Sequence, residues 1–233
     1  MRWAVSGLAF VIATVGFSTR VHAADPATGL TWLGHSSFKI ARKNSPVIYI
    51  DPWKIVGEPH DADAILITHP HFDHFSVPDI QKVAKPTTVI VGPEDCLKNL
   101  SGDLRPVKPG DQVELEAVTI EAVPAYNTNK AFHPKQNKWV GYIVDIGGTR
   151  IYHAGDTDVI PEMQGIQADV VLLPVSGTYV MTAEEAATAV GIINPKVAIP
   201  MHYGTIVGSQ NDARRFQERC APVPARILSQ KSL

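Results

Sequence analysis

A run of three histidines and one aspartate constrains this chain more than any other part of its sequence. Residues 68–74 read THPHFDH, and they follow directly on a short apolar segment. Imidazole nitrogen suits zinc, iron and nickel, and a carboxylate adds a harder oxygen ligand. In a tight turn after a strand, His69 and His71 can point one way. Asp73 and His74 can then point another, so the run predicts two metal ions about 3.5–4 Å apart.

Two further candidate ligands follow strand-like segments later in the chain. Asp156 comes shortly after residues 149–153, beside a glycine that permits close approach, and a carboxylate there can bridge two metals. His202 follows the apolar residues 197–200. Taken alone, each is as readily a turn aspartate or a structural histidine. Because sheet proteins place their chemistry where strands open into loops, we expect these strand ends to bring their ligands to one edge.

Strand-like and helix-like segments alternate along the rest of the chain, and no linker separates two halves. Strands are predicted over 30–34, 37–41, 47–50, 64–67, 88–91, 139–146, 149–153, 170–173 and 197–200, with two more within 112–123. Helices are predicted over 78–85, over 183–193 with a Thr182–Glu185 capping box, and over about 210–220. The pattern indicates one α/β domain with two sheets inside and helices outside.

The first 23 residues have a different character. A positive start at Arg2 precedes an almost wholly apolar stretch over residues 3–17, and small residues surround His22 where a signal peptidase reads. The apolar stretch is about 15 residues, whereas a membrane-spanning helix needs roughly 20. We therefore expect a signal peptide over 1–23, cleaved after Ala23 or Ala24, and an exported hydrolase domain over 24–233 that is periplasmic or secreted. The alternative is an uncleaved membrane anchor.

Composition narrows the choice of partners. The chain has 21 Lys and Arg against 23 Asp and Glu, and without residues 1–23 the 21 become 19, a net charge of −4. This balance argues against nucleic acid, and we expect a small-molecule substrate and no stable membrane insertion after signal cleavage. Cys96 and Cys220 match no metal-binding spacing, so each is interpreted as a buried free thiol.

Several motifs together resemble the metallo-β-lactamase superfamily. They are the HxHxDH run, the later Gly155-Asp156 pair and the histidine that ends a late strand. More narrowly, WLGHSSF at 32–38, IDP at 50–52, YHAGDT at 152–157 and IPMHYGT at 199–205 resemble metal-dependent hydrolases related to L-ascorbate-6-phosphate lactonase. The likeness covers roughly residues 30–206. It implies a four-layer αββα sandwich with a two-metal site at one edge.

The resemblance also implies a division of the ligands between two divalent ions. His69 and His71 hold the first metal, while Asp73, His74 and His202 hold the second and Asp156 bridges them. The metal implied is zinc, with manganese or iron as alternatives.

One position departs from the family pattern. The family supplies a third histidine to the first metal between the HxHxDH run and the Gly-Asp pair, and Asn127 stands about where that histidine is expected. An asparagine oxygen is a weaker, neutral ligand. His133, six residues later, either replaces the missing histidine or is a loop residue that binds substrate or nothing.

Two histidines receive other assignments. His35 is predicted to be catalytic, either orienting substrate or stabilising charge in the transition state. His153 lies three residues before Asp156, so strand alternation turns it to the opposite face, and we interpret it as structural. Tyr126, Phe132, Trp139 and Tyr179 are candidates for the wall of a substrate pocket or for the core.

These residues predict a metal-dependent hydrolase that uses a metal-bound hydroxide on an ester, lactone or phosphodiester. Asp73 is predicted to accept or steer the proton of the attacking water, besides binding metal. The alternatives are a metal- or ligand-binding protein of the same fold without turnover, which Asn127 keeps open, and a β-lactamase.

Overall fold

Two six-stranded sheets form the centre of the molecule. The structure is a computed structural model that describes residue 1 and residues 24–233. The first sheet runs in the order β1 (Leu30–Gly34), β2 (Ser37–Ile40), β3 (Ile48–Ile50), β4 (Ala62–Leu66), β5 (Ala84–Gly92) and β6 (Asp103–Pro106). The second runs β12 (Val197–Met201), β11 (Val170–Pro174), β10 (Thr149–His153), β9 (Val140–Ile146), β8 (Val118–Pro124) and β7 (Gln112–Leu115).

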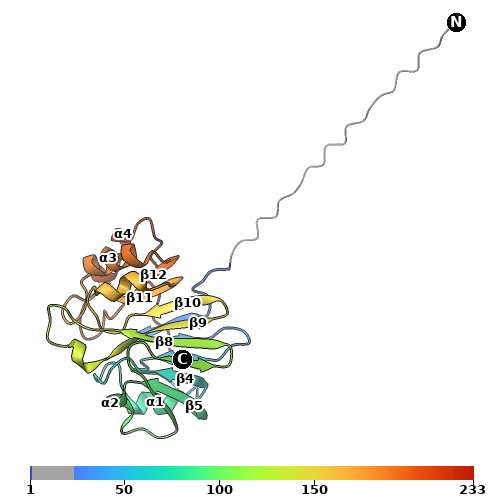
Figure 1. Ribbon diagram of the computed structural model, residues 1–233, viewed down its shortest axis with the longest axis vertical. Coiled ribbons are helices and arrows are strands. Elements are labelled where there is room, and N and C mark those ends of the chain that lie inside the picture. The colour runs from blue at the N-terminus through green and yellow to red at the C-terminus, as the bar shows by residue number, and fades with distance from the viewer. Residues whose placement is uncertain (2–23) are drawn as a thin grey trace.

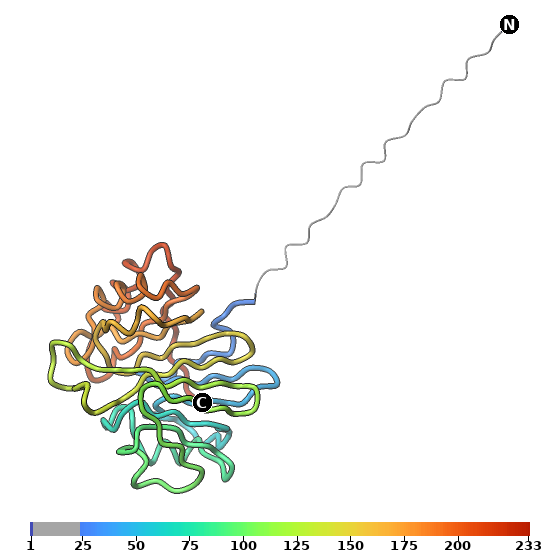
Figure 2. The backbone as a smooth tube through the Cα atoms, in the orientation of Figure 1, coloured from blue at the N-terminus to red at the C-terminus, as the bar shows by residue number. Residues whose placement is uncertain are grey.

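Helices cover the two outer faces. The α-helices are α1 (Val77–Val83), α2 (Glu94–Leu97), α3 (Ala183–Ile193) and α4 (Gln210–Arg219), and two short 3-10 helices are η1 (Lys135–Asn137) and η2 (Pro161–Gly165). Helices α1 and α2 pack against β5, whereas α3 contacts β11 and α4 contacts β12. Figure 1 shows the two helix pairs at opposite ends of the stacked sheets, and Figure 2 shows that the early and late parts of the chain separate in the same way. The predicted αββα sandwich is confirmed.

Strand β4 shows how one sequence serves two layers. Ala64 and Leu66 face the second sheet and belong to the core between the sheets, whereas Ile65 between them faces outward. There it joins Ile80 and Val83 of α1 in a second apolar cluster. Successive side chains of a strand point to opposite faces, and each large aliphatic side chain contributes about 1.5–3 kcal/mol when buried. This alternation explains why the strand is apolar throughout.

Parallel strand pairing positions the site. Strands β3 and β4 pair in parallel in the first sheet, and β10, β11 and β12 pair in parallel in the second. The carboxyl ends of parallel strands lie at the same edge of a sheet, so the residues that follow them gather there.

The helix boundaries agree with the sequence except at α1. The predicted helix over 78–85 spans Val77–Val83 instead, because Pro86 disfavours helical backbone at Lys85 and the chain enters β5 at Ala84. The predicted Thr182 capping box of α3 is present. Helix α2 and strand β6 had no clear signal in the sequence.

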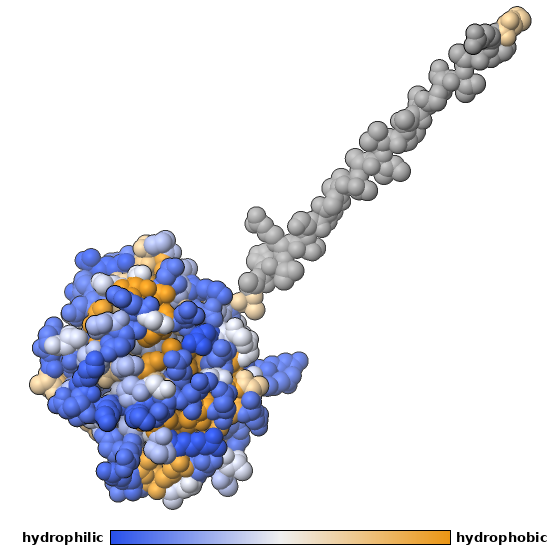
Figure 3. Space-filling model, viewed as in Figure 1, coloured by the Kyte–Doolittle hydropathy of each residue, from blue (hydrophilic) through white to orange (hydrophobic). Residues whose placement is uncertain are grey.

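The C-terminal segment packs against β1 of the first sheet. The backbone N–H of Lys231 donates to the Trp32 carbonyl at 3.0 Å, and the side chain of Gln230 donates to the Leu33 carbonyl at 3.0 Å. Cys96 and Cys220 are buried and free, as predicted. The face shown in Figure 3 is mainly hydrophilic, with apolar patches between the polar side chains.

The predicted signal peptide falls on residues that the structure does not describe, 2–23. Within residues 24–233, we find no helix with the length and apolar character needed to span a bilayer.

Candidate metal centre

Histidine and aspartate side chains from both sheets converge at the edge where the parallel strands end. They form three groups, each with one potential ligand atom per residue and all those atoms within 4.8 Å of one another, and the group of His69, His74 and Asp156 shares one member with each of the other two. The first cluster is His69, His71 and His133, and the second cluster is His35, Asp73, His74 and His202. The structure thus brings together every residue that the sequence proposed as a ligand, with His35 in addition.

Asp156 lies between the two clusters. Its Oδ2 atom is 3.3 Å from Nε2 of His133 in the first cluster and 3.0 Å from Nε2 of His202 in the second. Its Oδ1 atom is 3.3 Å from Nε2 of His74. A carboxylate that reaches histidines of both groups has the placement that a bridging ligand requires.

In the second cluster, the Nδ1 atoms of two histidines are held from behind. Nδ1 of His74 donates to Oδ2 of Asp51 at 2.7 Å, and Nδ1 of His202 contacts the Ser176 hydroxyl at 3.0 Å. Asp51 follows β3 and Ser176 follows β11. When Nδ1 is bound in this way, Nε2 is left to face the centre with its lone pair available.

In the first cluster, neutral groups contact the Nδ1 atoms of two histidines. Nδ1 of His69 lies 2.9 Å from the Thr68 hydroxyl, which itself donates to Oδ2 of Asp51 at 2.6 Å. Nδ1 of His133 donates to Oδ1 of Asn127 at 2.9 Å. Thr68 therefore links the first cluster to the carboxylate that supports the second.

His71 is oriented differently from the other histidines of the first cluster. Its Nδ1 atom, rather than Nε2, faces the cluster, 3.2 Å from Nε2 of His133. The indole of Trp139 packs against it with ring centroids 5.1 Å apart, and it also packs against His69 at 5.3 Å. Trp139 therefore forms an apolar wall behind the first cluster and restricts water there.

Asn127 holds the loop that carries His133. Its side-chain oxygen accepts from both the backbone N–H and Nδ1 of His133, at 3.0 and 2.9 Å. Its side-chain nitrogen donates to the Tyr179 carbonyl at 3.0 Å. The asparagine thus positions His133, and His133 occupies the place of the third histidine that the family pattern demands.

Four buried polar atoms at the centre test whether these residues suit a metal. Nε2 of His69, His74 and His202 and Oδ1 of Asp156 are buried and make no hydrogen bond of good geometry among the described residues, although His74 and His202 lie within 3.3 Å of the Asp156 carboxylate. A buried polar atom without a partner costs about 1–3 kcal/mol. These atoms point toward a common centre, and a divalent cation bound there would satisfy them. The donor set of imidazoles and carboxylates therefore fits a metal.

Burial and charge set the protonation of this group. Burial holds the pKa of His69 well below its usual range, so the side chain is neutral, the form that binds metal. Burial acts to lower the pKa of His74, but the carboxylates of Asp156 and Asp51 outweigh it and raise that pKa well above the usual range. Burial acts to raise the pKa of Asp156, and the imidazoles of His202 and His74 outweigh it and hold that pKa well below the usual range. The centre is thus built to hold positive charge beside Asp156.

His35, which was predicted to orient substrate or to stabilise charge in the transition state, is not among the residues that line the cavity above the centre. It is fully buried, and its Nε2 lies 3.0 Å from Oδ2 of Asp73. Burial lowers the pKa of His35 to about 4, and the hydrogen bond from His35 helps to lower the pKa of Asp73 to about 2 against the opposing effect of burial. His35 therefore lies behind Asp73, where it can hold the carboxylate or act as a ligand itself.

His153 lies outside both clusters. Its Nε2 donates to the Ser36 carbonyl at 2.8 Å, and its Nδ1 accepts from the backbone N–H of Gly155 at 3.2 Å. Both ring nitrogens are used, which leaves this histidine a structural role. No sequence pattern assigns a role to Asp51, Thr68 or Ser176. Asp51 could have been suspected from its place at a strand end before proline, whereas Ser176 carries no local signal.

A cavity of about 190 Å³ opens above the centre. Its floor is polar and includes Asp73, Asp156 and His202, and its remaining lining residues are His71, Phe72, Phe132, His133, Tyr179 and Ile206. Of the four aromatic residues considered for the pocket wall, Phe132 and Tyr179 line this cavity. Tyr126 and Trp139 are buried.

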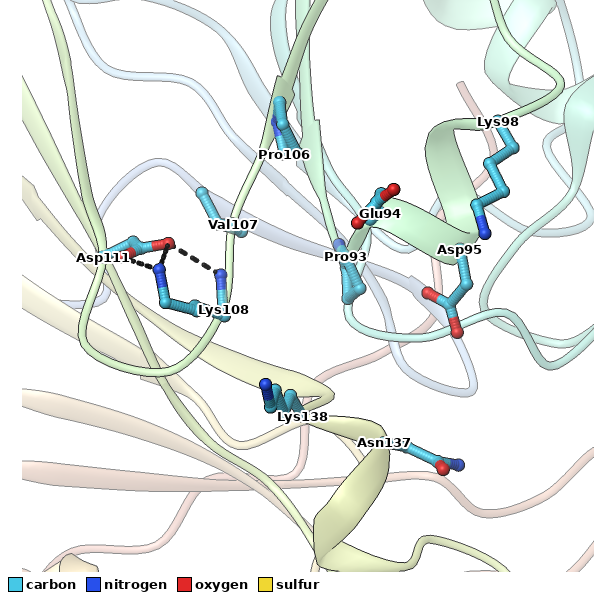
Figure 4. A pocket seen from close by; sticks show the side chains of 10 residues that line it. All are labelled: Pro93, Glu94, Asp95, Lys98, Pro106, Val107, Lys108, Asp111, Asn137 and Lys138. Carbon is cyan, nitrogen blue, oxygen red and sulfur yellow. Dashed lines mark hydrogen bonds and ion pairs between the residues drawn. The ribbon is translucent and has the colours of Figure 1, made fainter.

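A larger cavity, of about 620 Å³, lies beside α2 (Figure 4). It is lined by charges of both signs, and Figure 4 shows the pair between Lys108 and Asp111 at one side. Asp95 on its wall accepts from the Trp139 indole at 2.9 Å. Asp95 therefore connects this cavity with Trp139, which packs against His69 and His71.

Comparison with known proteins identifies relatives of the whole described chain. A family model of the beta-lactamase superfamily domain matches residues 29–202. A UPF0173 metal-dependent hydrolase of Thermoplasma volcanium is 31% identical over 215 residues, covering 87% of this chain and 95% of its own. Another from Myxococcus xanthus is 37% identical over 200 residues, covering 76% of this chain and 71% of its own.

A solved structure agrees with the sequence matches. A protein from Parabacteroides distasonis, named as a metal-dependent hydrolase, has a TM-score of 0.75 and 34% sequence identity and covers 87% of this chain and 93% of its own. The chain belongs to the metallo-β-lactamase superfamily and, within it, to the UPF0173 family of metal-dependent hydrolases. The family model and the relatives named above do not show the predicted relation to L-ascorbate-6-phosphate lactonase.

The same relatives do not support the expected signal peptide or the expected periplasmic location, and both expectations are withdrawn. Archaeal members from Thermoplasma, Methanopyrus, Pyrococcus and Archaeoglobus species resemble this chain over more than four fifths of its length. The family model begins only at residue 29, after the segment on which that expectation rested.

Proposed function

We propose that this enzyme hydrolyses an ester, lactone or phosphodiester bond at a centre of two divalent metal ions, with zinc as the first choice of metal. When bound, such ions supply a strong nucleophile from water at neutral pH and polarise the bond under attack. The first cluster would hold one ion and the second cluster the other, with Asp156 between them.

The chain's own residues would divide the remaining work. Asp73 faces the cavity and is held by His35, so its carboxylate is placed to accept and pass on a proton. Trp139 excludes water behind the first cluster, which strengthens electrostatic interactions in front of it. Asp51 and Ser176 keep their histidines in one orientation.

The observation that carries this proposal is the convergence of buried, unpartnered ligand atoms. Ring nitrogens from both sheets and one carboxylate oxygen point to one centre beneath a cavity. The alternative of a binding protein without turnover depends on Asn127, and the position of His133 beside His69 and His71 supports the hydrolase over it.

Metal analysis combined with a substrate panel tests the proposal. The full chain would be stripped of metal, reloaded with zinc, analysed for metal content, and assayed on esters, lactones and phosphodiesters. We expect about two ions per chain and metal-dependent turnover of at least one substrate class. His71→Ala and Asp156→Ala should lose both metal and activity, whereas His60→Ala, which changes an exposed histidine outside both clusters, should retain them. Full activity in the first two variants would overturn the proposal.

A further inference from the structure

The mouth of the metal-centre cavity is apolar. Among the described residues, seven large hydrophobic side chains are exposed, and three of these, Phe72, Phe132 and Ile206, line this one cavity. Their exposed fractions are 68%, 48% and 40%. Scattered apolar side chains on a surface need no explanation, but a group of them around a polar floor marks a binding site.

Neighbouring rings support these apolar walls. The Phe72 ring meets Trp53 edge to face with centroids 6.3 Å apart, and the Phe132 ring meets Tyr179 edge to face at 4.6 Å. The carbonyl of Tyr179 accepts from Asn127, which also fixes His133. The wall beside Phe132 is therefore built onto the same loop contacts that position the first cluster.

The cavity has no lysine or arginine among its described lining residues. Three lysines lie in the segment between β8 and β9 that carries Phe132; Lys138 lines the cavity beside α2, and the other two are already paired. Lys130 contacts Asp158 at 2.5 Å, and Lys135 contacts Glu162 at 2.9 Å. Sites that select phosphate or carboxylate groups use Arg or Lys for this purpose, in addition to any metal.

From these observations we propose that the substrate is an uncharged carboxylic ester or lactone with an aliphatic or aryl substituent, which lies against Phe72, Phe132 and Ile206. This inference rests on the proposed hydrolase function and selects among its substrate classes. Water adds to the acyl carbon, the bond from that carbon to the alkoxy oxygen breaks, and the alkoxy oxygen takes a proton. The products are a carboxylic acid and an alcohol, or the open hydroxy acid from a lactone.

A series of p-nitrophenyl esters tests the apolar wall. With the zinc-loaded full chain, kcat/KM should rise from acetate to hexanoate by about fourfold per methylene that becomes buried. The kcat/KM for the hexanoate should be higher than that for an ester of similar length that ends in a carboxylate. It should also be higher than that for bis(p-nitrophenyl) phosphate. Equal rates along the series, or a preference for either charged substrate, would overturn the inference.

Substitutions in the apolar wall distinguish a loss of contact with the substrate chain from a general loss of activity. Ile206→Ala and Phe132→Ala should lower kcat/KM for the hexanoate by about tenfold more than for the acetate, which corresponds to the loss of between one and two methylenes of buried contact at about fourfold each. Ile206→Lys should raise the relative rate on the carboxylate-bearing ester. Ile192→Ala removes an exposed isoleucine on α3, outside the cavity, and should leave the series unchanged.

A binding measurement keeps this inference separate from the proposed function. Calorimetry with acetohydroxamic and octanohydroxamic acid, which chelate metal through the same group, compares short and long chains without turnover. Tighter binding of the long chain, lost in Ile206→Ala, supports the apolar wall even if every substrate resists hydrolysis, an outcome that would sink the hydrolase proposal alone. Hydrolysis without any chain-length preference in rate or binding would retain the function and overturn the inference.

Discussion

The two clusters of the metal centre differ in how they are supported. In the second cluster, His74 is held by the buried carboxylate of Asp51, and Asp73 and Asp156 lie among its histidines. In the first cluster, the groups behind the histidines are the neutral Thr68 hydroxyl and the Asn127 amide. His71 is also partly exposed, whereas His35, His74 and His202 are buried.

This difference predicts unequal affinities. A carboxylate behind a histidine makes its metal-facing nitrogen more basic and cancels part of the metal's charge, which a neutral oxygen does far less. The second site should therefore fill first, and the first site should exchange its ion more readily. A two-step zinc titration of the stripped protein would measure this order.

The largest effect should come from removing the residue that both clusters share. Asp156→Ala should lose both ions and reduce activity by about 10³-fold or more, on the scale of a lost transition-state contact. Metal analysis and kcat/KM would measure it. If the variant kept one tightly bound ion, Asp156 would belong to one site, and the comparison between the clusters would have to be redrawn.

Asp51→Asn should weaken the second site more than the first, which Asp51 reaches only through Thr68. An asparagine that accepts from the Thr68 N–H turns its NH₂ group toward Nδ1 of His74, so it loses both the charge and the correct acceptor. We expect a loss of about 100-fold in second-site zinc affinity, the upper end for such supporting residues. Competition with a chromophoric chelator would measure it, with Asp61→Asn as a control carboxylate outside the centre. A loss confined to the first site would contradict this assignment.

Asn127→Ala should weaken the first site by about tenfold while the second site is unchanged. The substitution removes the acceptor for Nδ1 of His133 and frees the loop. Asn127→Asp should recover most of the affinity, because a carboxylate also accepts from Nδ1, and Asn137→Ala is a matched control on the exposed η1 helix. The interpretation fails if both variants bind zinc as the unchanged protein does.

Ser176→Ala should have the smallest effect. A single neutral hydrogen bond contributes about 1 kcal/mol, so second-site affinity should fall by only about threefold to tenfold. The same titration that serves Asp51→Asn would detect it. If Ser176→Ala lowered second-site zinc affinity as much as Asp51→Asn does, the charge of Asp51 would not explain why the second cluster binds more tightly.

Much of the fold was predictable because its signals are local. Apolar segments that end in polar residues gave the strands, and Thr182 with Glu185 gave the start of α3. Even the difference at α1 has a local cause, because Pro86 disfavours helical backbone at Lys85.

Some residues of the candidate site also have local signals in the sequence, whereas others come together only in the folded structure. The HxHxDH run is a contiguous signal, whereas the pairing of Ser176 with His202 exists only after β11 and β12 align in parallel. The choice between Asn127 and His133 likewise depended on how one loop closes, which no spacing rule specifies.

The contact between His35 and His202 has a consequence for how the molecule is made. The backbone N–H of His202 donates to the His35 carbonyl at 2.9 Å, so a turn from the start of the domain is joined to the end of its last strand. A chain still on the ribosome has the HxHxDH run long before it has residue 202. The second cluster is incomplete until residue 202 has been added, so metal held by all of its residues cannot template the early stages of folding. Metal binding by the complete centre therefore requires the finished chain.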